Sequence, residues 1–149
     1  MSHIAMIQVE GPLAASDLLS AAAPQKWAIP LYEAIRSQFR TVAVSRNTDI
    51  EIVRWWLRKE HLPGWSTVHH WNSPLSYDDW VVDLVREYLA NGWDMAFLLT
   101  SDPGISQRVR DMGVLTLTIG APVHPPGWRA DDSTFQPWEQ LVDTLDPRP

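Results

Sequence analysis

The sequence predicts an α/β fold in which a parallel β-sheet lies between two layers of helices, a three-layer Rossmann-like arrangement. Short apolar runs alternate along the chain with longer segments that carry apolar residues at helical spacing. Alternating strands and helices form parallel sheets with right-handed crossovers, and the helices then cover both faces. The chain has 149 residues, of which 45% are hydrophobic and 20% charged, and this predicts one globular domain over residues 1–149.

The expected elements follow one another from the N-terminus. The strands are short and mostly apolar, as is typical of buried parallel strands, and lie at residues 5–9, 41–45, 67–70, 95–99 and 114–119. The helices carry an apolar stripe and, with their caps, lie at residues 30–39, 48–61, 76–91, 102–113 and 137–145. Residues 4–120 form the core of the predicted domain, and a proline-rich loop at 120–132 precedes the last helix.

Two helix starts have recognisable capping patterns. Thr48 and Glu51 match a capping box, in which the Thr side chain bonds to the amide at Glu51 and Glu51 bonds back. Asp102 is followed by Pro103, the pattern of a capping Asp with Pro in the first turn. Both starts come directly after a predicted strand, so we expect both helix N-termini at the carboxyl edge of the sheet, where open α/β sheets bind their ligands.

Composition excludes several function classes. The net charge is −6, whereas a nucleic-acid-binding surface needs clustered Lys and Arg, so we expect no nucleic-acid partner. No apolar run is long enough to span a membrane, and no cysteine is present for disulfides, thiolate catalysis or cysteine-ligated zinc. The start lacks the basic residues of a signal peptide, so we expect a cytoplasmic protein. The preference for Arg over Lys, with many Trp and Pro, suggests a high-GC bacterial genome or one of its phages, and then the bacterial host cytoplasm.

Three stretches carry a resemblance to a known family. They are the apolar run 4–13, which ends in Gln8-Val9-Glu10-Gly11-Pro12-Leu13, the segment 41–49 and the segment 95–120. Together they resemble the first, second and fourth motifs of the haloacid dehalogenase (HAD) superfamily. The spacing around 59–89 is closest to the small phosphatase domains of phage polynucleotide kinases. This resemblance implies a HAD-like sheet of strand order 3-2-1-4-5, without a folded cap domain because residues 14–25 are too few to build one.

The same resemblance implies that the catalytic motifs are degenerate. The family's first motif reads D-x-D-G-T-L and its first Asp attacks phosphorus, but here Gln8 stands at the nucleophile position and Glu10 at the general acid. Ser45 matches the Ser or Thr that binds the phosphoryl oxygen, and no Lys occurs at the third motif. Ser101 takes the place of the first acid of the fourth motif, and Asp102 could replace it after a one-residue shift, although helix capping is the simpler interpretation.

The predicted function is therefore that of a HAD-like pseudoenzyme that binds a protein partner, a second copy of itself or a phosphorylated ligand, without a cofactor. Two alternatives stay open. One is an active Mg²⁺-dependent phosphohydrolase that uses Glu10 and Asp102 in altered roles, and the other is a virion or assembly component. Magnesium prefers carboxylate oxygens, and Gln8 and Ser101 supply none, so we expect no metal site. His69, His70 and His124 make a weak metal pattern, because adjacent residues of a strand point to opposite faces.

Candidate binding residues lie around the predicted strand ends. Ser45 and Arg46 could hold an anion at the N-terminus of the helix that follows them, where the amides and the helix dipole favour negative charge. The chain contains nine tryptophans, and Trp and Arg are enriched in the energetic centres of protein interfaces. We expect Trp71 and Trp128, beside Pro- and Gly-containing loops near this edge, to form an interface, the alternative being that they pin those loops to the domain.

Overall fold

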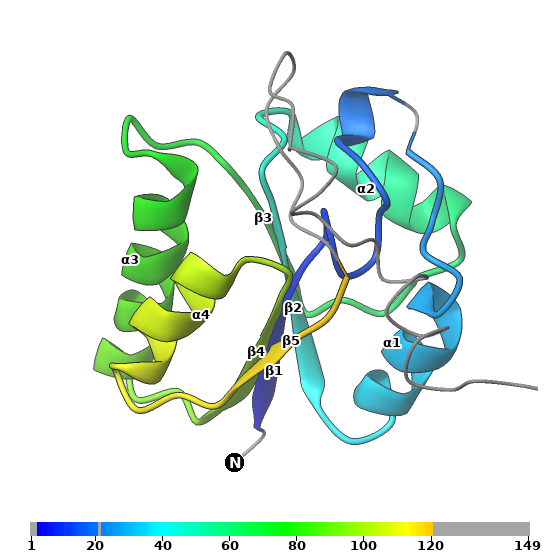
Figure 1. Ribbon diagram of the computed structural model, residues 1–149. Helices are drawn as coiled ribbons and strands as arrows, with labels where there is room; N and C mark the ends of the chain where they lie inside the picture. Colours follow the sequence, from blue (N-terminus) through cyan, green and yellow to red (C-terminus); the bar gives the residue numbers. More distant parts are fainter. Residues whose placement is uncertain (1–2, 21, 121–149) are drawn as a thin grey trace, which may run out of the picture.

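The computed structural model describes residues 3–20 and 22–120 and shows a five-stranded sheet between two layers of helices (Figure 1). The strands are β1 (Ile4–Gln8), β2 (Arg40–Ser45), β3 (Thr67–His70), β4 (Met95–Thr100) and β5 (Thr116–Thr118). The helices are the short 3₁₀ helix η1 (Leu18–Ser20) and the α-helices α1 (Ala28–Arg36), α2 (Ile50–Lys59), α3 (Tyr77–Ala90) and α4 (Pro103–Arg110).

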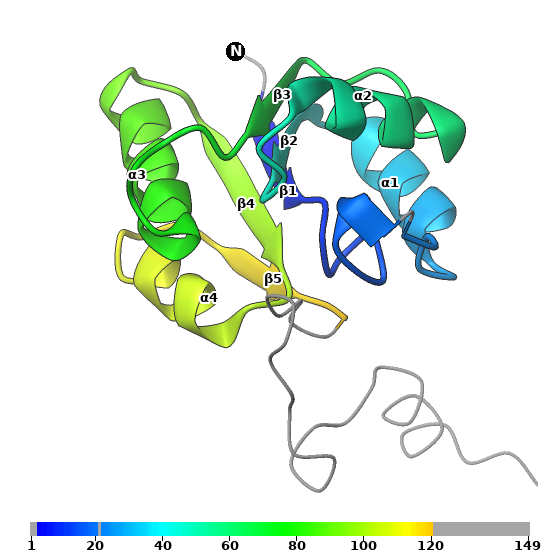
Figure 2. The ribbon, with the colours of Figure 1, turned by 90° about the horizontal axis from the view of Figure 1, so that it is seen from above.

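All neighbouring strands are parallel, and their order is β3-β2-β1-β4-β5. This confirms the predicted fold class and strand order. Helices α1 and α2 cover one face of the sheet and α3 and α4 the other, as the view from above shows (Figure 2). No helix in the described part of the chain is long and apolar enough to cross a membrane.

The central strands bury both of their faces, so apolar residues at consecutive positions contribute to two separate cores. On β1, Ala5 and Ile7 pack with α1 and α2, whereas Ile4 and Met6 pack with α3 and α4. Every residue of β1 is buried. A strand that is covered on both sides has a continuous apolar run, and this explains why residues 4–9 could be recognised without an alternating pattern.

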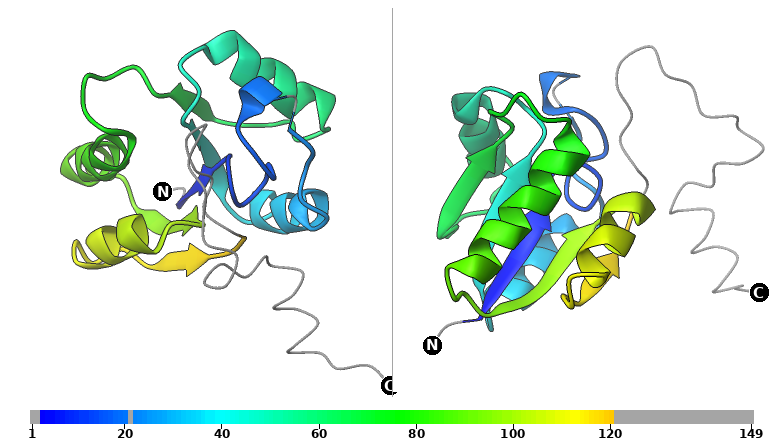
Figure 3. Two further views of the ribbon diagram at one scale, coloured as in Figure 1. Left: turned by 45° about the horizontal axis from the view of Figure 1, so that its top comes forward. Right: turned by 90° about the vertical axis from the view of Figure 1, so that its left-hand side faces the viewer.

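The segment after β1 turns back over the α1–α2 side of the sheet, where η1 lies beside α2 (Figure 3). It forms isolated bridges from Ala14 to Glu10 and to Pro24 rather than a folded cap. The indole Nε1 of Trp56 donates a hydrogen bond of 2.8 Å to the Ala22 carbonyl and so fixes this segment to α2. The arrangement leaves the carboxyl ends of β1, β2 and β4 on the same edge as the N-termini of α2, α3 and α4.

Several predicted boundaries need correction. Asp49, not Thr48, caps α2: its side chain accepts from the Glu51 amide at 2.9 Å, because Asp49 has the extended backbone of an N-cap residue. Helix α1 begins and ends earlier than predicted, and α2 ends at Lys59 before the left-handed residue His61. Strand β5 is shorter than predicted, since only three of its residues pair with β4. The predicted helix at 137–145 lies outside the described residues.

Candidate functional site

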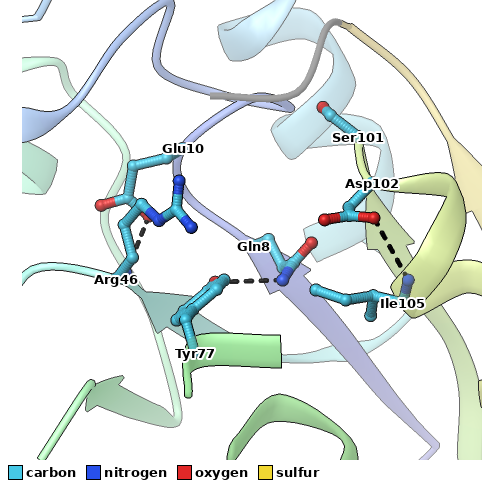
Figure 4. A pocket seen from close by; sticks show the side chains of 7 residues that line it. All are labelled: Gln8, Glu10, Arg46, Tyr77, Ser101, Asp102 and Ile105. Carbon is cyan, nitrogen blue, oxygen red and sulfur yellow. Dashed lines mark hydrogen bonds between the residues drawn. The ribbon is translucent and has the colours of Figure 1, made fainter. Parts of the chain in front are cut away.

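A pocket opens at the carboxyl ends of the central strands (Figure 4). Its lining comes from the end of β1, the loop after β2, the start of α3 and the β4–α4 junction, and consists of Gln8, Glu10, Arg46, Tyr77, Ser101, Asp102 and Ile105. We call this the strand-end pocket. It brings together five of the residues that the sequence predicted for the site, namely Gln8, Glu10, Arg46, Ser101 and Asp102.

Gln8 is held at both ends of its side-chain amide. Its Nε2 donates a hydrogen bond of 3.0 Å to the Tyr77 hydroxyl, and its Oε1 accepts one from the Thr100 hydroxyl. The residue is buried, and so are both of its partners. Burial is the main reason why the pKa of Tyr77 lies well above its ordinary value, so this hydroxyl stays neutral. Gln8 therefore links β1 to α3 and β4 through neutral groups.

The Glu10 carboxylate turns toward the loop after β2. Its Oε2 accepts from the Ser45 hydroxyl at 2.5 Å and its Oε1 from the Arg46 amide at 3.0 Å. Ser45 also accepts from the Asn47 amide at 3.1 Å, so the carboxylate and this hydroxyl together order the start of the loop. Ser45 is fully buried and bonded to Glu10 instead of facing the pocket. Burial raises the pKa of Glu10 although these hydrogen bonds and Arg46 lower it.

Asp102 caps α4, as the sequence predicted. Its Oδ1 accepts from the amides of Gly104 at 2.8 Å and Ile105 at 3.2 Å, and Pro103 occupies the first turn. The neighbouring Ser101 hydroxyl donates to the Ile119 carbonyl, which joins the end of β4 to the residue after β5. Both side chains thus have structural partners, and the Asp102 cap uses only one of the two carboxylate oxygens in the pocket lining.

Arg46 and Tyr77 form the wall opposite Asp102 (Figure 4). The guanidinium carbon of Arg46 lies 4.7 Å from the centre of the Tyr77 ring, in the range of a cation–π contact. Tyr77 is a site residue that sequence reasoning missed. The signal available was its place at the first turn of a helix that follows a strand, since that topology puts the residue at the carboxyl edge of the sheet.

The remaining predicted residues lie around the pocket or outside the described chain. Trp71 is half-buried; its Nε1 donates to the Leu75 carbonyl at 3.0 Å and its ring meets the Tyr77 ring edge-on, contacts that hold the β3–α3 loop. His69 bonds to the Tyr88 hydroxyl and His70 to the Thr48 carbonyl, on different sides of β3. Trp128 and His124 lie outside the described residues. Within 3–20 and 22–120, no three His, Asp or Glu side chains are grouped as metal ligands.

The raised pKa of Glu10 has a measurable consequence for stability. A carboxyl whose pKa is higher in the folded state favours folding fully below its unfolded-state pKa, which is near the ordinary value of 4.5. This contribution is lost as pH rises through the folded-state pKa. Replacing Glu10 by Gln removes the titration. We expect the melting temperature of Glu10→Gln, measured against the natural protein, to improve steadily from acid to neutral pH.

The readout is how the difference in melting temperature between the two proteins changes with pH. The loss of stability from placing an amide NH₂ beside Ser45 does not depend on pH, so it does not affect this change. Ser37→Ala, an exposed substitution that removes no titratable group, serves as the control and should give a difference that does not change with pH. A flat difference for Glu10→Gln as well would show that Glu10 titrates as an ordinary surface carboxyl.

Comparisons with known proteins identify the fold. No protein-family model matches the chain, and no curated protein does. A chain in the structure of the Pnkp1/Rnl/Hen1 RNA repair complex matches with a TM-score of 0.70 and 10% identity, over 81% of this chain and 43% of that chain. A chain in a structure of the Pnkp1/Rnl/Hen1 complex matches with a TM-score of 0.68 and 9% identity, over 83% and 48%. At these identities the likeness shows the fold alone, and this chain spans less than half the length of either neighbour.

Proposed function

We propose that the chain is a catalytically inactive relative of the HAD phosphatases that acts as a protein-binding domain. The observation that carries this proposal is the state of Gln8. A HAD phosphatase needs a carboxylate at this position, because its reaction passes through an aspartyl-phosphate. The Gln8 amide has no negative charge, and both of its ends are engaged in buried hydrogen bonds with Tyr77 and Thr100. The position thus serves to join three elements of the fold.

The contacts of Glu10 and Asp102 oppose the alternative of an active phosphohydrolase. Both Glu10 oxygens accept hydrogen bonds from the β2–α2 loop, and only 7% of the residue is exposed. A general acid has to reach the leaving group in a plausible substrate pose, and here that motion would break the contacts that order Ser45 and Arg46. One oxygen of Asp102 holds the first turn of α4.

Two observations support a protein partner. Both structural neighbours come from a complex of several proteins. In addition, Arg46, Tyr77 and Trp71 gather at one edge of the sheet, and interface centres are enriched in these residue types. The contacts of Trp71 with its own loop are compatible with an anchoring role, so an interface at Trp71 and Trp128 stays a prediction. Self-association, a phosphorylated ligand and a role in a phage particle are the other outcomes that a search for partners can return.

The proposal is tested by a phosphatase assay of the full chain with a generic aryl phosphate and millimolar Mg²⁺. We expect no turnover above the buffer blank, because the reaction lacks its nucleophile. The matched variant is Glu10→Gln, which removes the one carboxylate that the alternative enzyme would use as its acid. Turnover in the natural protein that is lost in Glu10→Gln would establish the active enzyme and end the proposal. Turnover equal in both proteins would point to a contaminating phosphatase.

A further inference from the structure

The magnesium ion that the family resemblance implies does not fit the donors of the strand-end pocket. Magnesium requires near-octahedral oxygen coordination, with one or two carboxylates supplied by the protein. Here the Gln8 carbonyl oxygen accepts from Thr100, and both oxygens of Glu10 accept from Ser45 and Arg46. One carboxylate oxygen of Asp102 accepts hydrogen bonds from two amides of α4. Apart from the second oxygen of Asp102, these side-chain oxygen donors are therefore engaged by groups of the protein itself.

The pocket nevertheless contains a positive charge. Among the described residues that line it, Arg46 is the only basic one, and Glu10 and Asp102 are the acidic ones. Figure 4 shows Arg46 beside Glu10, with Tyr77 and Gln8 between this pair and Asp102. The backbone fixes the start of the Arg46 side chain, because the Arg46 amide donates to Glu10. The Tyr77 ring supports its end, 4.7 Å below the guanidinium carbon.

The charge of Arg46 acts on three groups from two parts of the fold. It lowers the pKa of Glu10 after β1, of Tyr77 at the start of α3 and of the neighbouring Asp78, in each case against a larger opposing effect of burial. The negative charge of Asp102 raises the pKa of Asp78, and the positive charge of Arg108 lowers it to a smaller extent than Arg46 does. Removal of Arg46 would thus leave Glu10 and Asp102 in the pocket lining, and Asp78 next to Tyr77, without the only basic side chain among the described lining residues.

We infer that the Arg46 guanidinium is the built-in cation of the strand-end pocket and balances the negative charge of Glu10 and of the nearby Asp78 in place of a divalent metal ion. The inference rests on the proposed function, because it accounts for a HAD-like pocket that is independent of metal. A guanidinium suits this place, since it is always charged and stacks on an aromatic face.

The competing explanation is that Arg46 merely covers the Tyr77 ring with its aliphatic stem. Two substitutions separate the explanations. Arg46→Met keeps an unbranched side chain over the ring and removes the charge, whereas Arg46→Lys keeps the charge and removes the planar group. Arg108→Met is the matched control, because Arg108 forms an exposed ion pair of 2.8 Å with Asp79 outside the pocket lining.

The test is the thermal unfolding of these full-length variants, in the natural and in the Glu10→Gln background, from acid to neutral pH. At neutral pH we expect Arg46→Met to lower the melting temperature by about 3–6 °C, Arg46→Lys to lower it much less, and Arg108→Met to change it by about 2 °C or less. The loss in Arg46→Met should shrink toward acid pH, as Glu10 takes up its proton, and should shrink in the Glu10→Gln background.

If Arg46→Met lowers the melting temperature equally at every pH and in both backgrounds, Arg46 only packs on Tyr77 and the inference is wrong. If Arg46→Met does not fold, the natural protein alone still decides: the Glu10 carboxyl is followed by NMR with and without millimolar Mg²⁺. An unchanged titration supports the inference, and a titration displaced to lower pH by Mg²⁺ overturns it. Neither result depends on turnover, so failure of this inference leaves the phosphatase assay as the separate test of the proposed function.

Discussion

Replacing Trp56 by Ala should lower the free energy of unfolding by about 3–5 kcal/mol, the largest effect expected of any single substitution considered for this chain. Trp56 is fully buried in the core between the sheet and the α1–α2 layer. The substitution leaves a cavity, and it also removes the donor that satisfies the Ala22 carbonyl across the segment after β1. The loss of unfolding free energy is measured by urea unfolding, monitored by far-ultraviolet circular dichroism because this signal reports the backbone and not the missing indole.

The neighbouring Trp55 provides the control. It is about half exposed, and its ring contacts the Lys59 ammonium at 5.1 Å. An exposed cation–π contact contributes on the order of 0.5–1 kcal/mol, so Trp55→Ala should cost no more than that. Similar losses in the two variants would contradict the assignment of Trp56 to the core and of Trp55 to the surface.

Replacing Gln8 by Met should lower the free energy of unfolding by about 2–4 kcal/mol, because two buried hydroxyls lose their partner and each costs roughly 1–3 kcal/mol. Methionine is close to glutamine in volume, so a cavity contributes little. The affected groups are the hydroxyls of Tyr77 and Thr100, which lie on α3 and β4. The measurement is again the midpoint and slope of urea unfolding.

The same substitution in a Tyr77→Phe background tests the mechanism. Without the Tyr77 hydroxyl, Gln8→Met leaves one orphaned group fewer, so its cost should fall by about 1 kcal/mol or more. Ser106→Ala is the comparison for an unrelated buried polar contact, since Ser106 bonds to Thr116 on the other side of β4. If the losses in unfolding free energy of Gln8→Met and Tyr77→Phe simply add in the double variant, the Gln8 amide and the Tyr77 hydroxyl do not stabilise each other.

The part of the fold that could be predicted from the sequence is the part that local patterns specify. The continuous apolar run of β1 and the Asp102-Pro103 start of α4 each need only neighbouring residues to be recognised, and both are confirmed. The cap of α2 was misplaced by one residue, because Thr48 and Asp49 are both good capping residues. The choice between them depends on the Asn47 side chain, which accepts from the Asp49 amide at 2.8 Å and directs the turn.

The candidate site was predicted only in part, because its geometry depends on residues far apart in sequence. Gln8 and Glu10 could be placed at the strand end, but nothing near them indicates that one meets Tyr77 and the other Ser45. The two side chains are two residues apart on one chain segment, and yet Gln8 joins α3 and β4 whereas Glu10 joins the end of β2 and the loop after it. Helical periodicity likewise could not decide which of Trp55 and Trp56 is buried, since that depends on the segment after β1.

Isothermal titration of the full chain with Mg²⁺ shows whether the strand-end pocket is complete without a metal ion. With Gln8 neutral and Glu10 and Arg46 joined within the pocket, we expect no heat beyond that of dilution. Saturable binding tighter than about 0.1 mM, equivalent to roughly 5.5 kcal/mol, would contradict it. Such binding, if lost in Glu10→Gln, would place a metal site in the strand-end pocket.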